Sequence, residues 1–433
     1  MHYDLCIIGA GPGGYRAAEY AAQQGMTVVV FEGAEPGGTC LNVGCIPTKT
    51  YVHSATFAEA RERMPQVVAQ LRAGVEGILA QPNITLIRAN ARLADGHTVE
   101  AQTPLANHPS SVTADNIIIA TGSETKWLPI PGVDDARVVD STGLLNLDTL
   151  PKRLTIIGAG VIGMEFASIF NRFGSEVTVI EYLKECLPAL DGDIAKRLRK
   201  TLEKRGIVFK MKTAVENIAD IDADIILMAT GRKPRTEGLN LEGIGIGLAP
   251  NGAIPVDDHF QVSARRSSAG ARLYAIGDVN GRQMLAHAAE MQAVHAVNHI
   301  LGRTDGIDFS IMPAAIFTAP EAACVGPTEE RLKEQHIPYA CRKSFWRANG
   351  KALAMGESEG ILKLFISMPA EDKDAAPEGQ EAGLILGCHA YGAHAADIVQ
   401  EVSALMCRHT TIAQLCDMVH IHPTLSEVLT GCC

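Results

Sequence analysis

The stretch Leu5-Cys6-Ile7-Ile8-Gly9-Ala10-Gly11-Pro12-Gly13-Gly14 places a GxGxxG turn between an apolar run and an alanine-rich segment. A second apolar run, Thr27–Phe31, follows and ends at Glu32. This pattern predicts a strand, a glycine turn, a helix and a second strand. In such a unit the first two glycines let the backbone approach a pyrophosphate at the helix N-terminus, and the third lets the helix pack on the strand. The acid then reaches a ribose hydroxyl pair.

The same pattern occurs a second time in the chain. Leu154–Ile157 leads into Gly158-Ala159-Gly160-Val161-Ile162-Gly163, and the run Val177–Ile180 ends at Glu181. The acid stands 23 positions after the first glycine in both copies. One GxGxxG is a weak signal, but two copies in the same context favour two dinucleotide sites over two glycine turns that bind nothing.

Each copy ends with a further apolar strand and the tripeptide Ala-Thr-Gly. Asn116–Ile119 precedes Ala120-Thr121-Gly122, and Asp224–Met228 precedes Ala229-Thr230-Gly231. The first copy has 40 more residues between its first glycine and this alanine, and they include Cys40 and Cys45. We therefore expect an α/β protein with two Rossmann-like dinucleotide-binding domains and a C-terminal α+β domain. The predicted limits are 1–143 and 144–268 for the two domains, 269–309 for a central segment, and 310–433 for the last domain.

The composition argues against several classes of partner and location. Lys and Arg total 38 against 49 Asp and Glu, for a net charge of −11 without a basic tract, so no nucleic acid or anionic membrane is expected as a partner. No apolar run approaches the ~18–20 residues that span a bilayer. The chain opens on a strand pattern without the regions of a signal peptide, so a cytoplasmic location is expected. The 11 cysteines are scattered and show no zinc spacing, so no metal site is expected.

The segment Gly37-Gly38-Thr39-Cys40-Leu41-Asn42-Val43-Gly44-Cys45-Ile46-Pro47-Thr48-Lys49 carries the clearest chemical signal. Side chains five positions apart on a regular helix point ~140° apart, which forbids a disulfide. Gly44 permits an irregular turn that brings Cys40 and Cys45 together. Pro47 suits the first turn of a helix expected through Thr48–Arg63, whose N-terminus and Lys49 lower the pKa of a thiol at Cys45. A redox disulfide is favoured over two unlinked buried thiols.

This segment, the two glycine motifs, Gly277-Asp278 and the stretch His422-Pro423-Thr424-Leu425-Ser426-Glu427 resemble the pyridine nucleotide-disulfide oxidoreductases. The resemblance covers essentially the whole chain in the same order, and it is greatest to the branch that oxidises dihydrolipoyl groups. It implies that the central segment completes an FAD site and that the C-terminal domain forms a homodimer.

The resemblance also implies roles for individual residues. Cys45 lies against the flavin, Cys40 exchanges with substrate, and Lys49 lies near the flavin N5 and pairs with Glu165. The residues implied at FAD in the first domain and central segment are Gly9, Gly11, Gly14, Glu32, Thr39, Lys49, Thr121, Gly122, Asp278 and Ala286. Those implied at the nicotinamide cofactor are Gly158, Gly160, Gly163, Glu181 and Gly231. The carboxylate at Glu181 repels a 2′-phosphate, so NAD is expected rather than NADP.

His422 is implied as the acid–base that acts near Cys40, with Glu427 as the carboxylate that orients it. Two alternatives remain open. His422 can be a surface histidine, with His420 as its nearest competitor. Glu427 can instead close a capping box with Thr424, and we expect that one carboxylate does not fill both roles.

The expected function is FAD-dependent oxidation of protein-bound dihydrolipoyl groups by NAD through a Cys40–Cys45 disulfide. The implied partners are a second copy of the chain and lipoyl domains of 2-oxo acid dehydrogenase complexes or the glycine cleavage H protein. One alternative is a related flavoprotein that reduces another disulfide or mercuric ion, for which the terminal pair Cys432-Cys433 would be an accessible metal-binding dithiol. Another alternative is a catalytically idle subunit that serves assembly of a complex.

Overall fold

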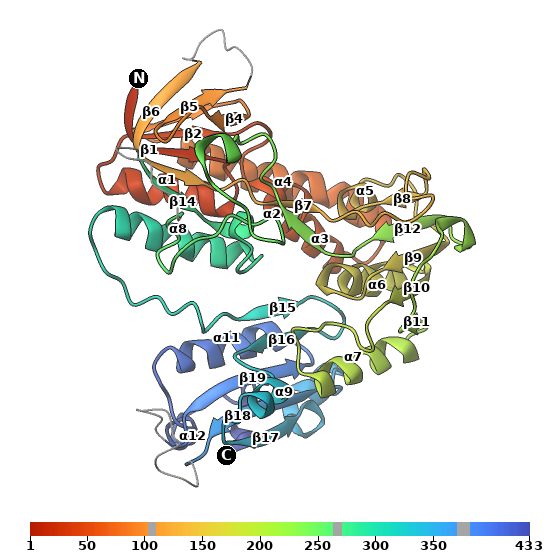
Figure 1. Ribbon diagram of the computed structural model, residues 1–433. Coiled ribbons are helices and arrows are strands. Elements are labelled where there is room, and N and C mark those ends of the chain that lie inside the picture. Colours follow the sequence, from red (N-terminus) through yellow and green to blue (C-terminus); the bar gives the residue numbers. More distant parts are fainter. Residues whose placement is uncertain (103–109, 263–270, 370–381) are drawn as a thin grey trace. The chain divides into compact units, whose positions relative to one another are not determined.

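A seven-stranded sheet forms the centre of the first of two units in the computed structural model, which describes residues 1–102, 110–262, 271–369 and 382–433. This unit comprises Met1–Trp127, Ser141–Asn146 and Gly231–Ile307. Its strand order is β3-β2-β1-β6-β5-β4, and β14 also pairs with β6 (Figure 1). The strands are β1 (His2–Ile8), β2 (Val28–Phe31), β3 (Ile84–Ile87), β4 (Ala91–Leu93), β5 (Thr98–Ala101), β6 (Ser111–Ile119) and β14 (Arg272–Ala275).

Strand β1 lies between β2 and β6 and is parallel to both, as the glycine motif predicts. Its buried run Leu5–Ile8 has no polar side chain, which is typical of a strand covered on both faces. The helices of this unit are α1 (Pro12–Gln23), α2 (Gly38–Val43), α3 (Cys45–Val52), α4 (Phe57–Leu79), α5 (Ser141–Leu145) and α8 (Ala286–Ile300). A short antiparallel pair, β7 (Ser123–Thr125) with β13 (Arg232–Pro234), follows the two Ala-Thr-Gly tripeptides.

The second unit begins with a parallel five-stranded sheet in the order β11-β10-β9-β12-β8. It comprises Leu128–Asp140, Leu147–Thr230 and Asp308–Cys433. Its strands are β8 (Val138–Val139), β9 (Arg153–Ile157), β10 (Glu176–Glu181), β11 (Val208–Met211) and β12 (Ile225–Met228), and its helices are α6 (Val161–Phe173) and α7 (Gly192–Lys204). The motif strands β10-β9-β12 repeat the order β2-β1-β6, so the two predicted copies form the same Rossmann-like unit.

An antiparallel sheet in the order β15-β16-β19-β18-β17 belongs to the same unit. Its strands are β15 (Ala314–Ile316), β16 (Ala322–Val325), β17 (Tyr339–Phe345), β18 (Ile361–Ser367) and β19 (Ile385–Tyr391). The helices are α9 (Glu329–Glu334), α10 (Gly350–Met355), α11 (Ala395–Met406) and α12 (Ile412–Cys416). Its core joins the buried side chains of Trp346, Leu364 and Val399. The predicted C-terminal α+β domain is therefore present.

The division into two units does not test the predicted domain limits. β8 precedes residue 143 but pairs with β12 of the second unit, and β14 of the predicted central segment completes the first sheet. The limit at 268 lies outside the described residues. Among the described helices, none has the length and apolar character needed to cross a membrane.

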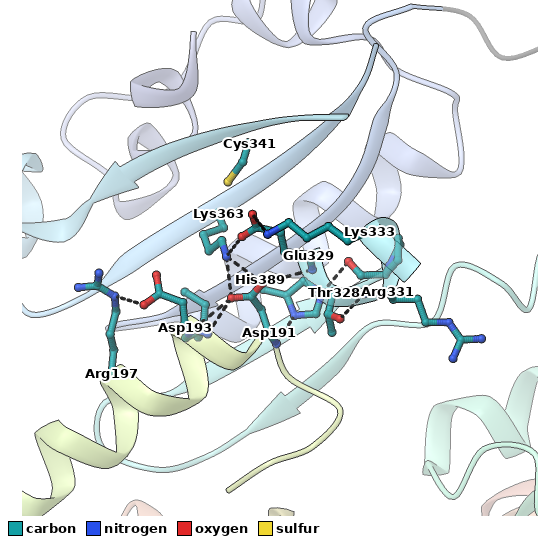
Figure 2. A network of polar contacts seen from close by, with 12 residues as sticks. Asp191, Asp193, Arg197, Thr328, Glu329, Arg331, Lys333, Cys341, Lys363 and His389 are labelled. Carbon is teal, nitrogen blue, oxygen red and sulfur yellow. Dashed lines mark hydrogen bonds and ion pairs between the residues drawn. The ribbon is translucent and has the colours of Figure 1, made fainter. Parts of the chain in front are cut away.

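A buried ion network joins the parallel sheet's helix α7 to the antiparallel sheet (Figure 2). The Lys363 ammonium on β18 lies 2.8 and 2.9 Å from the two oxygens of Asp191 and 2.6 Å from Glu329 Oε2. Its side chain is 2% exposed and that of Asp191 0%. Asp191 is also the N-cap of α7, and its backbone N–H donates to His389 Nδ1 at 3.0 Å. The Lys363 hydrogen bond is the largest cause that lowers the pKa of Glu329 to about 2.

Lys363→Met is expected to lower the free energy of unfolding by about 3–5 kcal/mol, because it leaves the buried Asp191 carboxylate without its cation. Urea unfolding of the FAD-loaded parent and variant at pH 7 measures this difference. The control is Lys351→Met, which replaces an exposed lysine on α10. Because the pKa of Glu329 is lowered in the folded protein, its ionised carboxylate adds to the free energy of unfolding above pH ~4.5. This addition is lost as the pH falls toward 2. Equal urea midpoints for Lys363→Met and the parent protein would contradict the prediction.

Candidate functional site

At the first and third glycines of both motifs, nearby backbone atoms leave no room for a side chain. A Cβ on Gly9 would lie 2.5 Å from the Ala120 carbonyl oxygen, and one on Gly158 would lie 2.4 Å from that of Ala229. Cβ atoms on Gly14 and Gly163 would lie 1.9 and 2.0 Å from the carbonyl oxygens of Gly9 and Gly158. Glycine is therefore required at the first position by the alanine of Ala-Thr-Gly, and at the third position by the carbonyl of the motif's own first glycine.

The middle glycines face open space. A Cβ on Gly11 would have only the Gly38 Cα within 4 Å, at 3.9 Å, and a Cβ on Gly160 would have no atom that close. Gly11 and Gly160 are the N-caps of α1 and α6, and neither helix start is capped by a side chain. The backbone N–H groups at these ends are suited to a pyrophosphate, so both motifs fit the dinucleotides expected from the sequence.

The two motif acids reach back to their glycine turns in the same way. Glu32 accepts hydrogen bonds from the Ala10 N–H at 2.7 Å and the Ala34 N–H at 2.8 Å. Glu181 accepts from the Ala159 N–H at 2.6 Å and the Leu183 N–H at 2.7 Å. Each carboxylate oxygen takes one backbone bond and keeps a lone pair for a ribose hydroxyl.

Asp278 lies in the turn after β14, joined to the strand pair that follows the tripeptides. Its Oδ2 accepts a hydrogen bond from Ser123 Oγ at 2.5 Å, and Arg232 donates to the Ser123 hydroxyl and carbonyl at 2.7 Å each. Burial raises the pKa of Asp278, and Ser123 and Arg232 oppose this shift. No motif in the sequence indicates Ser123 or Arg232 as a site residue, although each follows directly after the last glycine of a repeated Ala-Thr-Gly.

Other residues predicted to contact a cofactor lie at or next to the ends of strands and helices. Thr121 follows β6 and donates from its hydroxyl to the Arg235 carbonyl at 2.6 Å. Gly122 and Gly231 have φ of +73° and +107°, and Ala286 is the first residue of α8. Gly231 belongs to the first unit, whereas Gly158, Gly160, Gly163 and Glu181 belong to the second.

The cysteine segment forms two short helices separated by Gly44. Helix α2 carries Thr39 and Cys40 and ends at Val43, and α3 begins at Cys45. A Cβ on Gly44 would lie 2.8 Å from the Thr39 carbonyl oxygen, so the irregular turn predicted at this glycine is present and requires it. Tyr51 on α3 is buried and donates to the Leu145 carbonyl at 3.0 Å, which anchors the helix.

The prediction of one helix through Thr48–Arg63 is wrong. Helix α3 ends at Val52 and α4 begins at Phe57. Thr56 caps α4 by accepting from the Glu59 N–H, and Glu59 accepts from the Ala55 N–H at 2.8 Å. This local capping pattern starts a new helix and ends the previous one.

Cys40 and Cys45 are present as thiols and interact with each other. The side-chain hydrogen bond to Cys45 raises the pKa of Cys40, burial raises it further, and Lys49 lowers it. A hydrogen-bonded thiol pair across an irregular turn is the arrangement that a reversible disulfide requires, so the redox role remains our prediction.

Lys49 and Glu165 belong to different units, so their predicted pairing stays a prediction. Glu165 lies on α6, is buried, and accepts from the Phe317 N–H at 2.9 Å. It thereby links the second glycine motif to the segment that leads from β15 into β16.

His422 and Glu427 form a pair in the C-terminal stretch. Glu427 Oε1 lies 2.8 Å from His422 Nδ1, while Oε2 accepts from the Thr424 N–H at 2.8 Å. The expectation that one carboxylate does not fill both roles is therefore wrong, because each oxygen fills one of them. The Thr424 N–H and His422 together lower the pKa of Glu427, so it stays ionised beside the histidine.

His422 and His420 differ in their surroundings. The side chain of His422 is 79% exposed, whereas His420 is largely buried and its Nε2 lies 3.2 Å from Glu401 Oε1. Since Glu427 holds Nδ1 of His422, the Nε2 atom of that exposed ring is the one that can take a proton.

The interpretation of Cys432-Cys433 as an accessible vicinal dithiol is wrong. Cys433 forms a disulfide with Cys416, and Cys432 is 2% exposed within the core of the C-terminal domain. Adjacent residues on a short turn point in different directions, so only one of them reaches the surface. In the part of the chain that the structure describes, no group of three or more His, Cys, Asp or Glu side chains could hold a metal ion.

Comparison with known proteins agrees with this architecture. A profile of the pyridine nucleotide-disulphide oxidoreductases matches residues 3–293, and one of the dimerisation domain of that family matches residues 312–432. The chain is 34% identical to the mitochondrial dihydrolipoyl dehydrogenase of Pisum sativum over 98% of this chain and 90% of the relative. Identity to the dihydrolipoyl dehydrogenase of Chlamydia trachomatis is also 34%, over 98% of this chain and 95% of the relative.

Among solved structures, the HOCl-induced flavoprotein disulfide reductase RclA from Escherichia coli, as its Cu(II) complex, is similar with a TM-score of 0.88 and 31% identity. The alignment covers 100% of this chain and 99% of that chain. Enzymes of the matched family use FAD and NAD(H), which confirms the cofactor prediction. Both the matched profiles and the near-complete coverage of these relatives lead to one conclusion: the chain belongs to the pyridine nucleotide-disulfide oxidoreductase family.

Proposed function

We propose that the protein is an NAD-dependent dihydrolipoyl dehydrogenase that oxidises protein-bound dihydrolipoyl groups through a Cys40–Cys45 disulfide. The observation that carries this proposal is the His422–Glu427 pair, with 2.8 Å between Nδ1 and Oε1. A dithiol substrate must lose protons to attack a disulfide, and an imidazole held by a carboxylate is a base matched to that task near neutral pH. The two dihydrolipoyl dehydrogenase relatives at 34% identity support the same substrate class.

The proposed reaction exchanges one disulfide for another. His422 Nε2 takes a proton from a substrate thiol, and the resulting thiolate attacks Cys40 of the Cys40–Cys45 disulfide. This step forms a mixed disulfide with Cys40 and releases Cys45 as a thiolate. The second substrate thiol then displaces Cys40, so the dithiol is oxidised and the cysteine pair gains two electrons. A bound FAD would supply the acceptor for this electron pair and the route from it to NAD. The Cys45 hydrogen bond and burial raise the pKa of Cys40 in the thiol form, and Lys49 is the nearby cation that opposes this shift.

The proposed partners follow from this reaction. The match to the dimerisation domain supports a homodimer. Lipoyl domains of 2-oxo acid dehydrogenase complexes or the glycine cleavage H protein would supply the substrate, and the cytoplasm stays the predicted location.

A second candidate is a reductase that uses the same residues to reduce a different disulfide. The similarity to the flavoprotein disulfide reductase favours it. Mercuric reduction is less favoured because Cys432 is buried and Cys433 is bonded to Cys416.

Purified protein loaded with FAD is expected to oxidise dihydrolipoamide with NAD, with kcat/KM about 100-fold higher for NAD than for NADP. Two like charges about 5 Å apart repel by roughly 3 kcal/mol at an effective dielectric constant of ~20, which corresponds to this ratio. Steady-state kinetics with both cofactors measure it. Glu181→Gln is the matched variant, because it removes the charge and keeps an acceptor for the Ala159 N–H. It should lower the ratio of kcat/KM for NAD to kcat/KM for NADP. Absence of dihydrolipoamide turnover, with rapid NADH-dependent reduction of another disulfide, would select the second candidate.

A further inference from the structure

Cys416 and Cys433 form a disulfide outside the motifs that carry the proposed reaction. Cys416 is the last residue of α12, and Cys433 follows the turn Thr430–Cys432. Their Cα atoms lie 5.6 Å apart, inside the range of ~4.4–6.8 Å that a disulfide requires. Both residues are exposed, so the bond is accessible to thiols in solution.

The disulfide closes a loop that contains the His422–Glu427 pair. The two cysteines are 17 positions apart, and the loop between them includes Thr424 and the turn Leu425–Val428. We call residues 417–432 the histidine loop. In its first part Val419 is 99% and Ile421 79% exposed, and the largely buried side chain of His420, at Glu401, is the contact between them.

The second part of the histidine loop is anchored by different contacts. Asn349 donates to the Thr424 carbonyl at 3.0 Å, and Val428, Leu429 and Cys432 are buried in the core of the C-terminal domain. The disulfide ties this anchored part to α12, at the other end of the exposed part. Opening it removes the covalent constraint on the segment that presents His422 but leaves the core contacts in place.

We infer that Cys416–Cys433 is a second thiol–disulfide exchange site of this protein, that its reaction partners are small dithiols and disulfides, and that its state controls the order of the histidine loop. One thiolate of a dithiol attacks a sulfur of the bond, forms a mixed disulfide with that cysteine, and releases the other cysteine as a thiolate. The second thiol of the dithiol then displaces the remaining cysteine. The dithiol is oxidised, Cys416 and Cys433 are reduced to thiols, and a small disulfide reverses the exchange by accepting the same two electrons.

The consequence for catalysis rests on the proposed function of His422. With the bond closed, the loop samples few conformations and holds the imidazole where Glu427 orients it. With the bond open, the half-reaction with dihydrolipoamide is expected to slow severalfold, because a base must be positioned closely to act. Flavin reduction by NADH does not use His422 and should not change.

The bond itself is tested on the full-length, FAD-loaded protein. The protein is equilibrated with mixtures of reduced and oxidised dithiothreitol, alkylated, and cleaved at Glu427, which separates Cys416 from Cys433. We expect a disulfide-linked peptide pair, assigned to Cys433 rather than Cys432 by fragmentation, that disappears reversibly as the dithiol fraction rises. Failure to detect the pair under fully oxidising conditions would overturn the inference.

Hydrogen exchange of the same samples tests whether the Cys416–Cys433 disulfide controls the order of the histidine loop. Amide exchange in the histidine loop is expected to be about tenfold or more faster in the reduced protein, because a cross-link of this loop length strongly restricts local opening. In the double variant Cys416→Ser, Cys433→Ser, the amides of the histidine loop should exchange fast in both redox states. Cys407→Ser, which replaces an exposed cysteine outside the loop, should behave like the parent. A redox-dependent change in loop exchange that persists in the double variant would overturn the control of the loop by Cys416–Cys433. If that variant does not fold, the oxidised and reduced parent still give the comparison.

These readouts separate this inference from the proposed function. Redox-dependent loop exchange in a protein that does not turn over dihydrolipoamide would support the exchange site and contradict the proposed function. Normal dihydrolipoamide turnover, with identical loop exchange in both redox states, would support the function and overturn the control of the loop.

Discussion

Cys45→Ser is expected to abolish dihydrolipoamide turnover, with a loss of about 10⁴-fold or more, while the protein remains yellow from bound FAD. Serine cannot form the disulfide with Cys40, so the substrate dithiol has no bond to exchange with. The variant should also lose the long-wavelength absorbance that a thiolate beside an oxidised flavin produces on partial reduction. Anaerobic titration with NADH, followed by absorbance, measures this spectroscopic change independently of turnover.

Cys40→Ser provides the matched comparison for this prediction. It should lose turnover to the same extent but keep the long-wavelength band, because the sulfur predicted beside the flavin is retained. Cys407→Ser should keep both turnover and the band. A band that survives in Cys45→Ser and disappears in Cys40→Ser would reverse the assigned roles of the two cysteines.

His422→Gln is expected to lower the rate of dihydrolipoamide oxidation by about 10²–10⁴-fold, the usual contribution of a general base. Glutamine preserves a polar side chain beside Glu427 but cannot take the substrate proton. Reduction of the flavin by NADH should proceed at the parent rate, because that half-reaction does not need the base. Rapid-mixing measurements of the two half-reactions separate these effects.

Two further variants test whether His422 acts chemically. His97→Gln, an exposed histidine in the first unit, should leave both half-reactions unchanged. Glu427→Gln should give a smaller loss of dihydrolipoamide oxidation, because it keeps the imidazole and removes only the carboxylate that holds its Nδ1 atom. Equal slowing of both half-reactions in His422→Gln would mean that the residue has a structural role.

The duplicated fold could be predicted from sequence because its signal is local. The closed positions of Gly14 and Gly163 and the reach of Glu32 and Glu181 are set within one strand, turn and strand, so spacing alone indicates them. Gly44 was identified for the same reason. The break between α3 and α4 was missed although its cause is also local, because Thr56 and Glu59 form a capping pattern inside a sequence that otherwise reads as a continuous helix.

Contacts between distant positions could not be predicted. Nothing near Cys433 in the sequence indicates Cys416 as its partner, since the pairing depends on how α12 packs in the C-terminal domain. The double role of Glu427 was excluded by treating its carboxylate as one acceptor, whereas its two oxygens bind different donors. Ser123 acquires its role from Asp278, which is 155 positions later.

The burial of Lys363 against Asp191 and Glu329 has a consequence for engineering the protein. A fragment that ends before the C-terminal sheet would retain the Asp191 carboxylate at the start of α7 but lose the ammonium that neutralises it. The same fragment would also lose the strands that carry Lys363 and His389 against Asp191, so the carboxylate would be exposed to water. A chimera that imports a relative's C-terminal domain must bring a lysine at this position of the second strand from the sheet edge, or replace Asp191 with a neutral N-cap such as asparagine or serine.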